Sequence, residues 1–140
     1  MEIVINYWAV LVCALASMVI GAVWYGPLFG KLWLRVIKAD AMDMARRKEM
    51  QKAAAPLYAI QFLLTLFHAY VLAHYIAGWK EASGVENAIW LWAAFIMPTV
   101  AGASMWTNDE RTIVWTRFWL QAGYYLVTMI VFGLILGMWR

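Results

Sequence analysis

Residues 3–24 read IVINYWAVLVCALASMVIGAVW, an apolar run without a charged side chain. At a helical rise of 1.5 Å per residue, about 20 such residues cross the ~30 Å hydrocarbon core of a bilayer. Glu2 precedes the run, and neither a basic flank nor a cleavage site of the A-x-A kind marks a signal peptide. We therefore predict a first transmembrane helix that is kept in the mature protein.

The composition extends this prediction to the whole chain. Of its 140 residues, 66% are hydrophobic and 14% are charged, against about 25% charged in ordinary soluble domains. A soluble domain of this size has too little interior to bury so much apolar surface. Three further apolar runs occupy residues 56–76, 87–106 and 112–139. We predict one transmembrane domain over residues 1–140, an all-α membrane protein with a four-transmembrane-helix bundle.

The connection over residues 28–54 is also predicted to be helical. Lys31, Arg35 and Lys38 are spaced by four and three residues among apolar neighbours, which is typical of an amphipathic helix in the membrane interface. The sequence predicts a second, short cytoplasmic helix after it, capped by Asp40 and carrying an Asp43–Arg47 pair. Pro56 is expected to begin the next span.

Two capping boxes predict where the last two spans begin. Ser83 stands three residues before Glu86, and Thr107 stands three residues before Glu110. In this motif the hydroxyl group accepts a hydrogen bond from the backbone at the third helical position.

The distribution of basic residues predicts the orientation. Nine of the eleven Lys and Arg residues fall in the connection between spans 1 and 2 or around the start of span 4. The remaining two are Lys80 and Arg140. By the positive-inside rule, we expect both termini of this multi-pass protein to be non-cytoplasmic. The expected partners are the lipid bilayer and its anionic lipids, and no nucleic acid.

Small residues recur at four-residue spacing in the first span, at Ala9, Cys13, Ser17 and Gly21, and Gly133 and Gly137 form a GxxxG pair in the last. Such rows let helices approach closely in lipid. They are interpreted either as packing within one bundle or as the seam of a homodimer.

Polar residues form one stripe on span 2 and another on span 4, at matched depth in the membrane. Polar groups in hydrocarbon need partners, so both stripes should face the bundle interior. The candidate cavity residues are Gln61, Thr65, His68, Arg117, Gln121, Tyr124 and Thr128. Either they fix the helices by hydrogen bonds, or they bind a ligand, with His68 as a group that titrates near neutral pH.

Residue types needed for several chemistries are absent from the spans. No carboxylate lies inside them, and the lone Cys13 has no neighbouring metal ligands in the sequence. The sequence also has no phosphate-binding glycine loop and no nucleophile elbow. We therefore expect no metal, no cofactor and no catalytic residue, and a membrane enzyme is the least favoured class.

The stretch WYGPLFGKLW, residues 24–33, follows the first span. Proline disfavours helix at the preceding residue, so the chain is expected to turn at Gly26-Pro27 onto the interfacial helix. The residues of this membrane-interface motif are Trp24, Tyr25, Gly26, Pro27, Lys31 and Trp33. With NDERTIVWTRFWLQAGYYLVTMIVFGLILGMW at residues 108–139, the motif resembles a bacterial family of small four-span inner-membrane proteins of unknown function. The resemblance implies the topology and a location in a bacterial inner membrane, and it implies no activity.

Two functions remain open. The favoured one is binding or transport of a small polar or amphipathic molecule through a cavity inside the bundle. The alternative is a structural membrane protein that binds lipid or a partner through its basic cytoplasmic connection.

Overall fold

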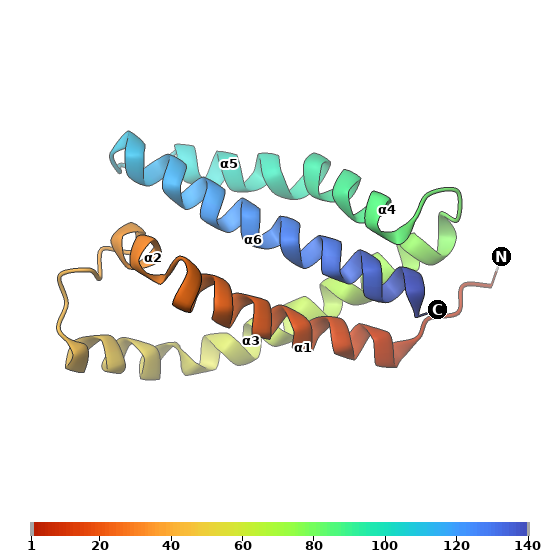
Figure 1. The fold of residues 1–140 in the computed structure, drawn as a ribbon, viewed down its shortest axis with the longest axis horizontal. Coiled ribbons are helices and arrows are strands. Elements are labelled where there is room, and N and C mark those ends of the chain that lie inside the picture. Colours follow the sequence, from red (N-terminus) through yellow and green to blue (C-terminus); the bar gives the residue numbers. More distant parts are fainter. Residues whose placement is uncertain (1, 140) are drawn as a thin grey trace.

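The computed structural model describes residues 2–139, which contain helices and no strand (Figure 1). The helical segments are α1 (Tyr7–Val23), η1 (Trp24–Leu28), α2 (Gly30–Val36), α3 (Met44–Gly78), α4 (Gly84–Leu91), η2 (Trp92–Ile96), α5 (Met97–Met105) and α6 (Arg111–Met138). Both η segments are π-helical and continue the helices that they join.

Four of the resulting helices are long and apolar enough to cross a membrane. They cover Tyr7–Leu28, Met44–Gly78, Gly84–Met105 and Arg111–Met138. This confirms the prediction of an all-helical chain with four helices of that length and composition. The first begins at Tyr7 because Asn6 caps it, its side-chain oxygen accepting hydrogen bonds from the backbone of Trp8 and Ala9.

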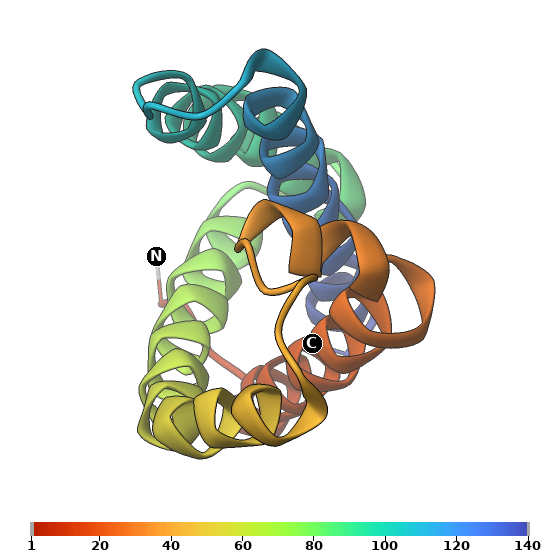
Figure 2. The same cartoon turned by 90° about the vertical axis from the view of Figure 1, so that its left-hand side faces the viewer.

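Helix α6 is the central element. It packs against α1 on one side and against α4 and α5 on the other, while α3 packs mainly against α1. Figure 2 shows the result as an open arrangement, with α1 and α3 on one side of α6 and the α4–α5 helix on the other. The buried core is built mainly from small and medium side chains of α1, α3, α4 and α6, including Cys13, Ala69, Ile76 and Ala88, around the larger Phe132.

The rows of small residues pack inside this one chain. Ala9, Cys13 and Ser17 are buried against the neighbouring helices. At the other end of α6, a Cβ atom added to Gly133 would lie 2.6 Å from the carbonyl oxygen of Gly84. The backbones of α4 and α6 therefore meet at a distance that only glycine permits. The homodimer predicted from these rows stays a prediction.

The predicted break at Pro56 is wrong, because α3 runs from Met44 to Gly78 with Pro56 inside it. The predicted cytoplasmic helix and the second span are therefore one helix (Figure 1). Proline removes a single backbone donor, and the alanines before it are strong helix formers, so the helix continues through the loss.

The start of α3 differs from the prediction in its cap and in its predicted ion pair. Asp43, rather than Asp40, caps α3 by accepting a hydrogen bond from the Arg46 amide at 2.8 Å. Arg47 donates to the carbonyl oxygens of Ala39 and Asp40 instead of pairing with Asp43. Each backbone acceptor lies just before the helix start, within reach of a side chain on its first turn.

Of the two capping boxes, Ser83 is confirmed as the cap of α4, where its hydroxyl oxygen accepts from the Glu86 amide at 3.1 Å. Thr107 is not a cap, because α6 begins only at Arg111 after Glu110. Thr107 instead donates to the carbonyl oxygen of Ser104. The residues between Thr107 and Arg111 form a loop, and Asp109 in this loop forms ion pairs with Lys38 and Arg117.

The turn after the first helix lies later than predicted. Gly26 and Pro27 remain helical within η1, where Phe29 donates to the Trp24 carbonyl at 3.0 Å, and the chain turns at Phe29. The wide π-helical turn accommodates a residue that cannot donate, which is why proline does not end the helix there. Lys31 and Arg35 on α2 and the adjoining Lys38 are exposed, as a basic stripe requires.

Candidate functional site

A cavity of about 210 Å³ lies between α1, α3 and α6. It is lined by Ser17, Gln61, Leu64, Thr65, His68, Tyr124, Tyr125, Thr128 and Phe132. Five of the seven residues predicted for a cavity line this one, three from α3 and two from α6. Helices α3 and α6 run in the same direction past α1. Their polar stripes therefore lie at the same depth, and the side chains of both stripes meet in this cavity.

The His68 side chain contacts a thioether sulfur and an aromatic ring. Its Nε2 atom lies 3.2 Å from the Met129 sulfur, and its ring meets the Phe132 ring edge-on with centroids 5.9 Å apart. A thioether sulfur is a weak acceptor, so this contact satisfies an imidazole nitrogen only partly. His68 therefore keeps most of its capacity to bind a polar group in the cavity.

Gln61 and Thr65 satisfy each other along α3. The Gln61 amide donates to the Thr65 hydroxyl oxygen at 3.2 Å, and that hydroxyl donates to the Gln61 carbonyl at 2.7 Å. The amide oxygen of Gln61 makes no hydrogen bond within residues 2–139, so this pair still offers an acceptor to the cavity.

The wall formed by α1 and α6 contains one bridge and one unpaired hydroxyl. Tyr124 donates to the Ser17 carbonyl oxygen at 3.1 Å, which ties α6 to α1. Thr128, one turn further along α6, is only 4% exposed, and its hydroxyl makes no hydrogen bond of good geometry in the described part of the chain, although the Tyr124 hydroxyl lies close to it. A buried hydroxyl without a full hydrogen bond costs free energy, so a rotation of the Thr128 side chain that brings its hydroxyl to a polar guest in the cavity would be favourable.

Arg117 and Gln121 lie outside this cavity. Arg117 donates to an Asp109 oxygen at 2.8 Å and to the Val36 carbonyl at 3.4 Å, which joins the start of α6 to α2. Lys38 pairs with the other Asp109 oxygen at 3.1 Å. The Arg117 hydrogen bond, aided by that of Lys38, lowers the pKa of the Asp109 carboxyl group below its ordinary value.

Four cavity residues were not predicted from the sequence. Ser17 belongs to the small-residue row of the first span, and Leu64, Tyr125 and Phe132 are not members of the polar stripes of α3 and α6. A cavity between three helices is lined by a wide arc of each helix. A stripe of polar residues identifies only part of that arc.

The membrane-interface motif packs against α6. The Trp24 indole donates to the Leu120 carbonyl at 2.9 Å, and its ring fills the space beside Gly123. Tyr25 contacts Trp33 and Tyr124, with ring centroids 4.7 and 5.4 Å apart. Gly30 is needed for close approach, since a Cβ atom there would lie 3.3 Å from the Tyr25 carbonyl oxygen.

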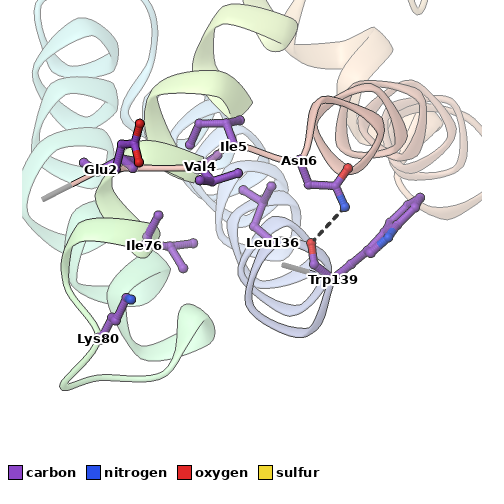
Figure 3. Close-up of a pocket in the computed structure, with 11 residues that line it drawn as sticks. Glu2, Val4, Ile5, Asn6, Ile76, Lys80, Leu136 and Trp139 are labelled. Carbon is purple, nitrogen blue, oxygen red and sulfur yellow. Dashed lines mark hydrogen bonds between the residues drawn. The ribbon is translucent and has the colours of Figure 1, made fainter.

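Two larger cavities lie at the ends of the fold. One of about 450 Å³ adjoins both chain ends, where Glu2, Ile76, Lys80 and Leu136 line it and Asn6 donates to the Trp139 carbonyl at 3.3 Å (Figure 3). The other, of about 570 Å³, lies beside the motif. Within residues 2–139, no three potential metal ligands come together.

The comparisons with known proteins give a family and no activity. A family model described as "Protein of unknown function (DUF1761)" matches residues 8–137. No curated protein and no solved structure matches the chain. Since the family model spans α1 to the end of α6, the chain belongs to the DUF1761 family.

Proposed function

We propose that this chain is a multi-pass protein of the bacterial inner membrane that binds, and passes, a small polar molecule through the cavity between α1, α3 and α6. The observation that carries the proposal is the buried Thr128 hydroxyl, which lacks a partner at a cavity that His68 and Gln61 also line. Three helices supply polar groups to one space, as a binding site requires.

The size of the cavity limits the molecule. Its 210 Å³ is below the roughly 300–1,000 Å³ of sites for drug-sized ligands. At about 30 Å³ for each water, it holds roughly seven waters. The proposed occupant is therefore a small neutral or protonatable molecule with both donors and acceptors, because the lining offers a hydroxyl, an amide oxygen and an imidazole.

The proposed orientation rests on the segments that gather at one end of the fold. Helix α2, the start of α3 and the α5–α6 loop lie together at one end, and the chain ends lie at the other (Figure 1). The former segments contain most of the basic residues. We assign that end to the cytoplasm. Alkaline phosphatase fused after residue 140 should be active, and a C-terminal green fluorescent protein should be dark.

A flux assay tests the proposed activity. Protein in proteoliposomes is exposed to gradients of glycerol, urea and protons, with light scattering and an enclosed pH dye as readouts. Thr128→Val and His68→Phe should lower the flux of at least one of these probes, whereas Gln121→Ala, outside the cavity, should not. Equal flux for all four proteins, or no flux above empty liposomes for every probe, would contradict passage.

The basic connection supports a second candidate function. Lys31 and Arg35 are exposed on α2 and form no ion pair within residues 2–139. Two unpaired cations at the proposed inner interface favour contact with anionic lipid. Such binding would anchor the protein in the membrane, whatever the polar cavity does.

A further inference from the structure

The 570 Å³ cavity beside the motif, called here the corner cavity, has an amphipathic lining. It lies between η1, α2 and the first half of α3. Its polar and aromatic lining residues are Tyr25, Lys31, Trp33, Arg47, Gln51 and Tyr58. Carboxylates are missing from this lining, so the two cations make the cavity electropositive.

Arg47 is held in place without being neutralised. It donates from Nε to the Ala39 carbonyl at 3.2 Å and from an Nη atom to the Asp40 carbonyl at 3.0 Å. The ion pairs within residues 2–139 both use Asp109, so neither Arg47 nor Lys31 has a carboxylate partner there. A positioned guanidinium and an ammonium at one cavity are suited to a phosphate group.

The apolar part of the cavity distinguishes a lipid from a soluble anion. Leu34, Ile37 and Met50 line it beside Trp33. Along α3 toward the membrane centre, Leu57 and Leu64 lie on one flank of the helix beside this lining, and both are more than half exposed. An acyl chain attached to a headgroup in the cavity would cover this exposed apolar surface, which a free phosphate would leave bare.

We propose that the corner cavity binds one anionic phospholipid, its phosphate against Lys31 and Arg47 and its acyl chains along α3. Trp33 and Tyr58 lie at the level between headgroup and hydrocarbon, where amphipathic rings are favoured. This site is separate from the polar cavity around Thr128. It rests on the proposed placement of α2 at the membrane interface and not on the proposed transport.

Native mass spectrometry of the detergent-purified full chain tests the site. The protein is titrated with phosphatidylglycerol, phosphatidylcholine and soluble glycerol phosphate. We expect one phosphatidylglycerol to bind in preference to phosphatidylcholine. Lys31→Gln should weaken that binding about tenfold, the loss of one charge-assisted contact. Lys48→Gln is the matched control, since Lys48 is an exposed cation on α3 outside the cavity lining.

Three results would overturn the proposal. They are equal binding of the two phospholipids, equal weakening by Lys31→Gln and Lys48→Gln, and binding of glycerol phosphate as tight as that of phosphatidylglycerol. Arg47→Gln should weaken binding further, but it also removes two backbone hydrogen bonds, so Lys31→Gln is the deciding variant. Because no step involves Thr128 or His68, failure here leaves the flux experiment unaffected.

Discussion

The hydroxyl group of Tyr124 donates a hydrogen bond to the carbonyl oxygen of Ser17, over 3.1 Å and across 107 residues of sequence. This bond joins α6 to α1 at the edge of the polar cavity. It fixes one wall, while His68 and Gln61 on α3 form the opposite wall. The two walls differ in their hydrogen bonding. In the first wall the Tyr124 hydroxyl group bonds to another helix, whereas in the second wall Gln61 and Thr65 bond to each other within α3.

Tyr124→Phe should therefore loosen the wall between α1 and α6. Removing the bond is expected to lower the free energy of unfolding by about 0.6 kcal/mol, the average for interhelical bonds in membranes. Tyr125→Phe is the matched control, since Tyr125 lines the same cavity and makes no side-chain hydrogen bond among residues 2–139. Steric-trapping measurements in bicelles would compare them, and equal losses for both variants would contradict the role of this bond.

Thr128→Val should separate stability from activity. Valine keeps the shape and removes a buried hydroxyl that has no partner, so the free energy of unfolding should stay constant or rise by up to about 1 kcal/mol. The flux through the cavity should fall.

Ser104→Ala provides the comparison, since the Ser104 hydroxyl is also buried without a partner but lines none of the three cavities described. As for Thr128→Val, the free energy of unfolding of Ser104→Ala should stay constant or rise, but its flux should equal that of the parent protein. A loss of stability in Thr128→Val would show that the hydroxyl has a partner within the fold.

The close approach of α4 and α6 depends on Gly133. Gly133→Ala would place a Cβ atom 2.6 Å from the Gly84 carbonyl oxygen, so the helices must separate. We expect a loss of about 1–3 kcal/mol from overpacking. Gly102→Ala meets no atom within 4 Å and should be neutral or slightly stabilising, because alanine favours helix. The same unfolding assay checks both variants, and a neutral Gly133→Ala would disprove the tight contact.

The Asp109 cluster predicts a pH-dependent contribution to stability. Hydrogen bonds from Arg117 and Lys38 lower the pKa of Asp109, so the folded protein holds its charged form more firmly than the unfolded chain does. The resulting stabilisation is present above the ordinary pKa of 3.8 and is lost as the pH falls through the lowered value.

Asp109→Asn should therefore be less stable than the parent protein at pH 7, and the difference should vanish in strong acid. Unfolding measured between pH 7 and pH 2, at low and high salt, checks this. A difference between the two proteins that does not change with pH would contradict the assignment.

The sequence predicts those features that depend on periodicity and is misleading where a tertiary contact competes with a local signal. Run length and composition suffice for the four long helices, and the shared depth of two stripes is enough to place His68 near Thr128. Thr107 has the sequence pattern of a cap. In the structure Asp109, in the same loop, forms ion pairs with Lys38 and Arg117, and α6 begins only at Arg111. Arg117 falls on the polar stripe, yet the start of α6 lies against α2, so its guanidinium reaches Asp109 and the Val36 carbonyl.

The most direct measurement for the central proposal is the reactivity of a single cysteine in the cavity. In a Cys13→Ala background, Thr128→Cys and Leu120→Cys are compared for labelling by a small water-soluble methanethiosulfonate. Leu120 is fully buried in α6 and lines none of the three cavities described. A thiol reacts as the thiolate, which forms where water reaches it. A cavity that holds polar molecules predicts rapid labelling of Thr128→Cys and none of Leu120→Cys, and equal protection of both would contradict it.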